Sequence, residues 1–127
     1  SAVAISWVGK VARERIPQLM NEADALFSAD VHPACPNSVI EALACGLPVV
    51  AYETGSLAEL VPASAGWIAP YGTNPWKLET PVVEPLARGL AQVLAQQEKF
   101  RAGARAYAES AFGIEAMTEK YLAALLG

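Results

Sequence analysis

The chain has 127 residues, of which 54% are hydrophobic, and a formal net charge of −4 at pH 7. This length allows one hydrophobic core and one domain, and the acidic balance excludes a protein that binds nucleic acids through a basic surface. No apolar run approaches the roughly 20 residues of a membrane span, and the start of the chain lacks the pattern of a signal peptide, so we expect a cytoplasmic protein.

The first predicted elements are a strand, a helix and a second strand. Residues 3–8 are apolar and end at Gly9, which indicates a buried parallel strand and its turn. Residues 13–23 carry apolar positions at helical spacing, so a helix is predicted there. The second strand follows over residues 24–31. It brings His32 to the carboxyl edge of the sheet, where ligands bind in folds of this kind.

His32, the single histidine, has two interpretations. It is either a loop imidazole that hydrogen-bonds backbone carbonyls, or a group that hydrogen-bonds the phosphate or sugar of a ligand. No Ser-His-Asp or Cys-His pairing is visible and no carboxylates cluster around it, so neither nucleophilic catalysis nor a metal site is predicted. Cys35 and Cys45 are expected to lie about 15 Å apart along a helix, too far for a disulfide, and are interpreted as thiols of a reducing compartment.

A short helix is predicted between Pro36 and Gly46. Pro36 sets an extended entry, Asn37 is expected to cap the helix, and Gly46 supplies a left-handed exit. The only charged residue is Glu41, one turn below Asn37 on the same side and within about 6 Å of the free N–H groups at the helix start. A phosphate suits those N–H groups, and a sugar diol suits the carboxylate. The alternative is a solvent-facing glutamate on a packing helix.

The segment after this helix predicts two more strands. Residues 47–52 form a buried run, and residues 65–70 are expected to form the last strand. Between them, Gly55 allows the backbone to approach a ligand closely, and Ser56 is expected to cap a short helix in a capping box with Glu59. The predicted fold class is therefore α/β, a Rossmann-like parallel sheet of about four strands with flanking helices.

The last part of the chain is predicted to be a loop followed by helices. Residues 71–85 are rich in proline and turn residues, and Trp76 within them is expected to cover the core, the alternative being a ligand contact. Residues 84–127 repeat apolar positions at helical spacing, and the pattern continues around Gly103 and Gly113 over residues 100–111 and 114–126. Their expected core contacts are Tyr107, Phe112, Tyr121 and Leu122.

Four stretches of the chain, in order, resemble one known family. They are Ala-Asp at residues 29–30, Cys-Pro-Asn-Ser-Val-Ile-Glu-Ala-Leu-Ala-Cys-Gly-Leu-Pro-Val-Val-Ala at 35–51, Gly-Ser-Leu-Ala-Glu-Leu-Val at 55–61 and Gly-Trp-Ile at 66–68. They are similar to the C-terminal, donor-binding domain of retaining GT-B glycosyltransferases. The resemblance implies that residues 1–127 are a single, partial nucleotide-sugar-binding domain of a longer chain, without the acceptor-binding N-terminal Rossmann domain.

The resemblance involves two acidic positions, of which only one is acidic in this chain. In that family two acidic residues eight positions apart bracket the donor. The second matches Glu41 and implies a contact to the ribose of the nucleotide, while the first, which contacts the donor sugar, falls at Pro33, so no catalytic residue is assigned. The stretch from His32 to Pro36 is shorter than in relatives with the Cys-Pro-Asn-Ser motif. Either a deletion has removed the acid, which predicts a weakened or inactive enzyme, or a mobile loop is missing from this sequence.

The resemblance also implies further donor-binding residues. The amides that follow Pro36 would face the diphosphate, and His32 would stand at the mouth of the site. The backbone around Gly9 would edge the pocket for the nucleobase, although an ordinary strand-to-helix turn explains the same residues. Thr54 and Gly55 would lie near the diphosphate or the acceptor. The full set is Gly9, Lys10, Val11, His32, Pro36, Asn37, Ser38, Val39, Glu41, Thr54 and Gly55.

The implied function is transfer of a sugar from a UDP- or GDP-sugar to an acceptor hydroxyl with retained configuration, by a hexosyltransferase that needs no metal or other cofactor. The segment by itself is expected to be inactive. Two alternatives stay open: a nucleotide-sugar epimerase or sugar phosphorylase of the same fold, and a non-catalytic binding or partner module.

The expected partners follow from the same resemblance. They are the nucleotide sugar, the acceptor and the missing N-terminal domain, but no nucleic acid. Peripheral membrane contact is expected only through the missing part. An isolated chain is expected to pair with another copy, because its first strand leaves an unpaired edge.

Overall fold

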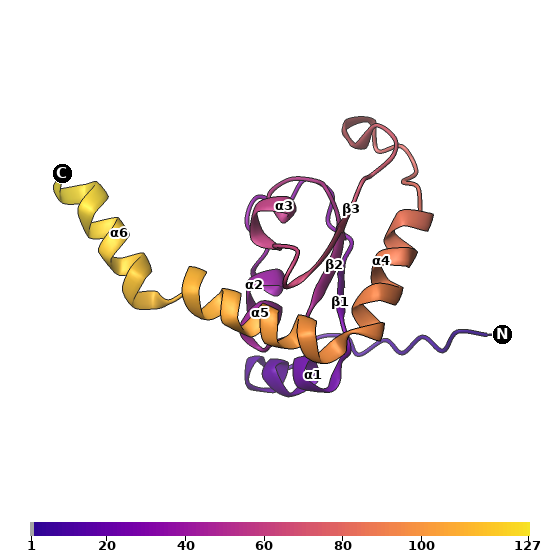
Figure 1. Cartoon of the computed structure of the whole chain (residues 1–127), viewed down its shortest axis with the longest axis horizontal. Helices are drawn as coiled ribbons and strands as arrows, with labels where there is room; N and C mark the ends of the chain where they lie inside the picture. The colour runs from indigo at the N-terminus through magenta and orange to yellow at the C-terminus, as the bar shows by residue number, and fades with distance from the viewer. Residues whose placement is uncertain (1) are drawn as a thin grey trace.

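The sheet is built around β2 (Val49–Tyr52), whose four residues are all buried. In the computed structural model, which describes residues 2–127, β2 pairs in parallel with β1 (Leu26–Ser28) and β3 (Gly66–Ala69). The order across the sheet is β1-β2-β3 (Figure 1). Because the strands are parallel, the segments that follow them all begin at one edge of the sheet. The predicted α/β class is confirmed, as a partial Rossmann-like domain.

Helices cover both faces of the sheet (Figure 1). α2 (Asn37–Ala44) and α5 (Gln97–Ala111) pack together on one face, and α4 (Glu84–Ala95) packs on β2 and β3 on the other. Successive residues of a strand point to opposite faces, so β2 supplies both cores. The larger core lies on the α2 side and includes Val39, Ala42, Leu43, Val49, Ala51 and Ala104, whereas Val50, Val93 and Phe100 form the core on the α4 side.

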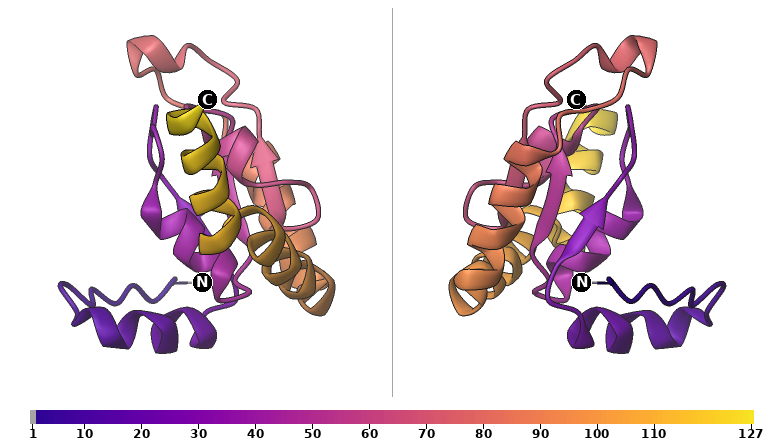
Figure 2. Two further views of the ribbon diagram at one scale, coloured as in Figure 1. Left: turned by 90° about the vertical axis from the view of Figure 1, so that its left-hand side faces the viewer. Right: turned by 90° about the vertical axis from the view of Figure 1, so that its right-hand side faces the viewer.

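Short elements lie at the two edges of the sheet. η1 (Arg13–Arg15) and α1 (Ile16–Glu22) lie beneath the amino edge, and α3 (Leu57–Leu60) follows β2 at the carboxyl edge. η2 (Pro75–Lys77) belongs to a loop that rises above the carboxyl edge (Figure 2). α6 (Ile114–Leu126) extends away from the body and buries none of its residues.

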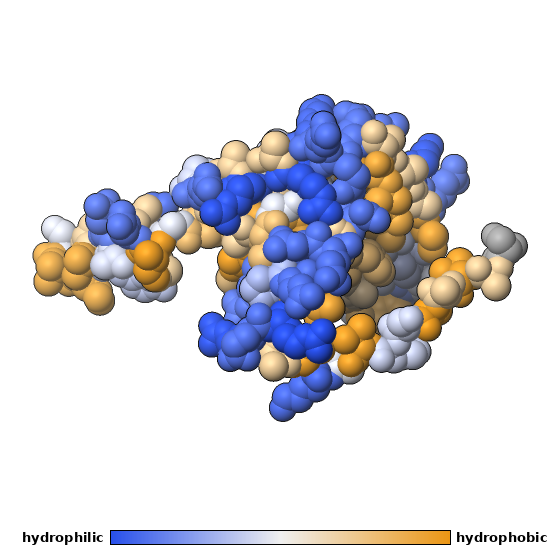
Figure 3. Space-filling view, turned by 90° about the horizontal axis from the view of Figure 1, so that it is seen from below, coloured by the Kyte–Doolittle hydropathy of each residue, from blue (hydrophilic) through white to orange (hydrophobic). Residues whose placement is uncertain are grey.

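Residues 3–8 do not form the predicted strand. They run as an extended, exposed arm away from the sheet, and Trp7 is 93% exposed. Seen from below, apolar residues line the arm towards the grey end of the chain (Figure 3). An apolar run becomes a stable strand only where a neighbouring strand pairs with its backbone. The sheet formed by residues 2–127 consists of β1, β2 and β3 and provides no such neighbour, so the prediction of about four strands was one too many.

The helical end of the chain is confirmed as α4, α5 and α6. Tyr107 and Phe112 pack against the larger core, with ring centroids 5.5 Å apart in an edge-to-face arrangement. Tyr121 and Leu122 are 64% and 51% exposed, so the prediction that they contact the core was wrong. The reason is that α6 leaves the body of the molecule. Across residues 2–127, every helix is too short or too polar to traverse a lipid bilayer.

Candidate functional site

The start of α2 is open. Pro36, extended with φ −73° and ψ 112°, occupies the position before the first helical residue. No side chain caps the helix, so the predicted Asn37 cap was wrong. The amides of Val39 and Ile40 donate to the Pro36 carbonyl at 3.1 and 3.4 Å. Those of Asn37 and Ser38 donate to no acceptor within residues 2–127, so these two N–H groups remain available to an anion.

Glu41 lies on the outer side of α2, one turn after Asn37. The inner side of the helix is formed by the buried residues Val39, Ala42 and Leu43, which turns the opposite side outward. Glu41 is exposed and borders a cavity of about 200 Å³ between α1 and α2. The cavity is lined by Arg13, Ile16, Pro17, Glu41, Ala44 and Cys45.

This cavity combines a small volume with both signs of charge. Pockets that enclose a whole small ligand measure about 300–1,000 Å³, so a cavity of about 200 Å³ accommodates one ring-sized part of a ligand. Arg13 and Glu41 both border it, and Glu41 forms no ion pair with any residue that the structure describes. A free carboxylate accepts hydrogen bonds from hydroxyl groups, and a guanidinium matches a phosphate.

Arg13 was not singled out from the sequence. Nothing in the run Arg-Glu-Arg at residues 13–15 distinguishes it from Arg15. Only the approach of α1 to α2 places it at the same cavity as Glu41.

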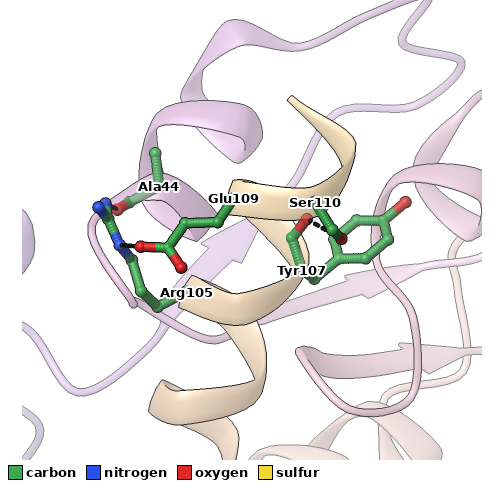
Figure 4. A network of polar contacts seen from close by, with 5 residues as sticks. All are labelled: Ala44, Arg105, Tyr107, Glu109 and Ser110. Atoms are coloured by element: carbon green, nitrogen blue, oxygen red, sulfur yellow. Dashed lines mark hydrogen bonds and ion pairs between the residues drawn. The ribbon is translucent and has the colours of Figure 1, made fainter. Parts of the chain in front are cut away.

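Helix α5 fixes the positions of both cavity walls. Arg105 donates from Nη1 to the carbonyl of Ala44, the last residue of α2, and from Nε to Oε1 of Glu109 at 2.8 Å (Figure 4). Arg101 donates from Nη2 to the carbonyl of Ala23, the extended residue that follows α1. Cations at the carboxyl ends of helices stabilise the last carbonyl groups. Both walls are therefore held by one neighbouring helix.

The segments at the carboxyl edge of the sheet pack against one another. Thr54 is buried, and its Oγ1 donates to the Asp30 carbonyl at 3.2 Å. Gly55 has a φ of +53°, and a Cβ atom there would lie 2.3 Å from the carbonyl oxygen of Pro33. Gly55 therefore allows a close approach to Pro33 of the same chain. Ser56 donates its amide to the Pro33 carbonyl at 3.0 Å.

The predicted capping box at Ser56 is wrong. Ser56 precedes α3, but its side chain forms no capping hydrogen bond. Its Oγ is buried and has no partner among residues 2–127. The amide of Glu59 donates to the Ser56 backbone carbonyl instead, at 3.0 Å, so the turn closes through main-chain atoms.

His32 and Trp76 form a stacked pair at the carboxyl edge. Nε2 of His32 donates to the Pro75 carbonyl at 3.0 Å, which confirms the interpretation of a loop imidazole bonded to backbone. The two rings lie 4.1 Å apart between centroids, at 14° to one another. Trp76 is 80% exposed, so the prediction that it covers the core was wrong. Tyr52 and Tyr71 fill the core at that end of the sheet instead.

Tyr52 ties the loop that carries Trp76 to the end of β2. Its hydroxyl donates to the Val82 carbonyl at 2.9 Å, and its ring meets that of Tyr71 edge to face with centroids 5.4 Å apart. Burial, and after it the neighbouring Tyr71, raise the pKa of the Tyr52 phenol. The phenol therefore stays protonated at neutral pH and keeps its hydrogen bond to the loop.

Gly9, Lys10 and Val11, which are predicted to contact a nucleobase, come shortly before Arg13 in the chain. Gly9 has a φ of +69° and is exposed like Lys10, and Val11 is half-buried. The chain passes from Val11 into η1, whose first residue, Arg13, borders the cavity with Glu41. Contact of Gly9, Lys10 and Val11 with a base stays a prediction.

The structure gives no assembled group of metal ligands. Among residues 2–127, no three His, Cys, Asp or Glu side chains gather closely enough to hold a metal ion. Cys35 and Cys45 are free thiols, the first exposed and the second half-buried. The candidate groups are the amides at the start of α2, the carboxylate and the guanidinium at the cavity and, on a separate loop, the stacked aromatic pair.

Comparison with known proteins adds independent information. The family model described as glycosyl transferases group 1 matches residues 2–96 of the chain. The matched span takes in the whole sheet, both walls of the cavity and the loop that carries Trp76, and it ends where α4 ends. No curated protein sequence matches the chain.

Proposed function

The chain belongs to the glycosyl transferases group 1 family, and from this premise we propose that it binds the nucleotide part of a sugar donor and serves a retaining transfer of the sugar to an acceptor hydroxyl. One observation carries the proposal. The open start of α2 and the unpaired carboxylate of Glu41 lie one turn apart on the same helix, and Glu41 borders a ring-sized cavity. A nucleoside diphosphate presents a matching pair of groups, an anion and a diol.

Each group of the donor has a partner in this arrangement. The ribose hydroxyls donate to the carboxylate of Glu41 in the cavity, and Arg13 adds positive charge on the opposite wall. The diphosphate accepts from the amides of Asn37 and Ser38. The backbone around Gly9 edges the base. The proposal includes no metal ion, because the helix start supplies positive charge at the diphosphate.

The chemistry of the site is largely electrostatic. When the bond between sugar and diphosphate breaks, negative charge grows on the leaving oxygen, and oriented N–H groups at a helix start stabilise it. Loss of one such oriented donor typically raises the barrier by about 2.7–4 kcal/mol. Loss of the ribose contact acts on both ground state and transition state, so it mainly weakens donor binding.

A second candidate is a module that binds the donor without catalysing transfer. Pro33 favours it, because this residue stands where the resemblance places an acid that contacts the donor sugar. A proline side chain neither accepts a hydrogen bond nor exchanges a proton. The two candidates share the nucleotide site and differ only in turnover.

Titration of the chain with UDP and with GDP by calorimetry tests the nucleotide site. Glu41→Gln should weaken binding of the preferred nucleotide by about 10- to 100-fold, since a hydrogen bond to a charged group contributes about 1.5–3 kcal/mol. The matched control is Glu98→Gln, an exposed glutamate in the first turn of α5 outside the cavity, which should leave the affinity unchanged. A wild-type chain that binds neither nucleotide, or a Glu41→Gln variant with full affinity, would refute the proposal.

A turnover assay then separates the two candidates. The full-length gene product that contains this chain is incubated with UDP-glucose or GDP-mannose, and the release of UDP or GDP is measured. Nucleotide release that the Glu41→Gln variant lacks supports an enzyme. Tight nucleotide binding without release supports the binding module.

A further inference from the structure

We propose that the exposed face of Trp76 is a platform for a pyranose ring, the saccharide of the donor or of the acceptor, and that His32 holds this platform in place. The inference rests on the proposed function, because the order of groups in a nucleotide sugar decides which ring reaches Trp76. It names a saccharide as the ligand in the contact that the sequence analysis left as an alternative for Trp76.

Trp76 presents an exposed aromatic ring that is held from one side only. Trp76 is 80% exposed although His32 is stacked on it, so one face of the indole is occupied and the other is open to solvent. A large apolar ring gains nothing for folding from this exposure, because Tyr52 and Tyr71 already fill the core beneath the loop. The open face is therefore free for a ligand.

The loop that carries Trp76 is closed by hydrogen bonds that hold this residue in place. The Asn74 side chain accepts hydrogen bonds from the amides of Trp76 at 3.0 Å and Lys77 at 3.3 Å. The amide of Asn74 donates to Oε2 of Glu79 at 2.9 Å, and the hydroxyl of Tyr71 donates to the Glu79 carbonyl at 2.6 Å. These bonds close the loop on itself, so a ligand that stacks on the indole orders little further backbone.

His32 supports the indole of Trp76 on the face on which it stacks. His32 has a φ of +63°, which is uncommon for a residue with a side chain, and its Nε2 donates to the carbonyl of Pro75, the residue before Trp76. The imidazole thus contacts both the backbone and the ring of η2. It therefore fixes the position and orientation of the indole at the carboxyl edge of the sheet.

The ring that reaches this platform is a saccharide for a topological reason. In the proposed site the ribose lies at Glu41 and the diphosphate at the start of α2, so the sugar extends beyond Asn37, away from Glu41. The loop that enters α2 begins at His32, and Trp76 lies on His32. The C–H groups of a pyranose carry a small positive charge and stack favourably on the negative face of an aromatic ring.

Binding measurements on four chains test the platform: wild type, Trp76→Ala, Trp76→Phe and Trp7→Ala. Each is titrated with UDP, UDP-glucose and methyl glucopyranoside, and binding is followed by NMR chemical shifts. Trp76→Ala should lose about tenfold in affinity for the saccharide part, by analogy with stacking of a planar base, and keep its affinity for UDP. Trp76→Phe should keep most of the affinity, because it retains a ring. Trp7→Ala is the matched control, since Trp7 is 93% exposed but lies on the N-terminal arm.

The ligands distinguish the source of the saccharide. If Trp76→Ala abolishes the preference for UDP-glucose over UDP, the platform holds the donor sugar. If it weakens only methyl glucopyranoside, the platform holds the acceptor. His32→Ala should reproduce a weaker form of the same loss, because the indole loses its support.

The outcomes for the platform and for the nucleotide site are separate. A Trp76→Ala variant with the saccharide affinity of the wild type, or a wild-type chain that binds no saccharide at millimolar concentrations, would overturn the platform. A chain that binds saccharide through Trp76 but neither UDP nor GDP would overturn the proposed function and support the platform. If UDP binding depends on Glu41 but saccharide binding is unchanged by substitution of Trp76, the proposed function is supported and the platform is overturned.

Discussion

Gly55 is the residue at which the packing of the carboxyl edge can be tested most directly. It has a φ of +53°, and its position allows the loop at Pro33 to lie against the turn after β2. Replacing it with alanine adds a single methyl group. That group meets the carbonyl oxygen of Pro33 at 2.3 Å and the proline ring at 2.6 Å, whereas real Cβ atoms stay beyond 3.0 Å from such neighbours.

Two effects add up in the Gly55→Ala variant. A left-handed backbone costs an alanine about 1–2 kcal/mol relative to glycine. The overlap with Pro33 forces the two loops apart, and strain of this kind costs about 1–3 kcal/mol. The free energy of unfolding should therefore fall by about 2–5 kcal/mol, a large part of the 5–15 kcal/mol that stabilises a typical domain.

Gly46→Ala is the matched control for the backbone effect. Gly46 ends α2 with a φ of +70°, close to that of Gly55, but a Cβ there meets nothing nearer than the Arg101 carbonyl at 3.5 Å, an ordinary contact. It should cost only the backbone part, about 1–2 kcal/mol.

Urea denaturation of both variants and the wild type measures the difference. We expect Gly55→Ala to be less stable than Gly46→Ala by about 1–3 kcal/mol, the part due to overlap. Equal losses in the two variants would show that the Pro33 loop moves away at no cost, and the argument that the carboxyl edge is tightly packed would fail.

Two further predictions concern α5 and Tyr52. Arg105→Ala should lower the free energy of unfolding by about 0.3–1 kcal/mol, because it removes a cation from the carboxyl end of α2. The control Glu109→Ala breaks only an exposed ion pair and should cost less. Equal losses for the two variants in urea denaturation would contradict a contribution from the helix end. Raising the pH through the ordinary tyrosine range near 10 should destabilise the chain. The pKa of Tyr52 is raised in the folded state, so its contribution to stability is complete below the pKa of the unfolded state. That contribution is lost as the pH rises through the pKa of the folded state. Tyr52→Phe should reduce the slope of stability against pH in that range, and an unchanged slope would exclude Tyr52 as its source.

The parts of the fold that depend on local interactions could be predicted from the sequence. The buried strand β2 and the helix α2 with its stop at Gly46 are confirmed, because short-range patterning and a left-handed glycine determine them. Residues 3–8 could not be predicted in the same way. Their composition favours a strand, but a strand also needs a partner, and composition carries no information about the partner. The Asn37 cap failed for a local reason, since Pro36 already occupies the entry position.

The candidate site was predictable only where one helix determines it. Helical periodicity alone places Glu41 one turn from the open amides of α2. The partnership of Arg13 with Glu41 and that of Trp76 with His32 depend on contacts between segments far apart in the chain. The bonds that position α1 and α2 on α5 span 78 and 61 residues. A sequence pattern that repeats every few residues carries no information about such contacts.

The attachment of both cavity walls to α5 has a consequence for how the site can change. The span that matches the family model ends at residue 96, and α5 begins at Gln97. Its arginines line no part of the cavity between α1 and α2. A substitution on α5 can therefore widen or narrow the space for a ring while every residue bordering that space stays the same. The dimensions of the cavity thus depend on a helix that does not border it.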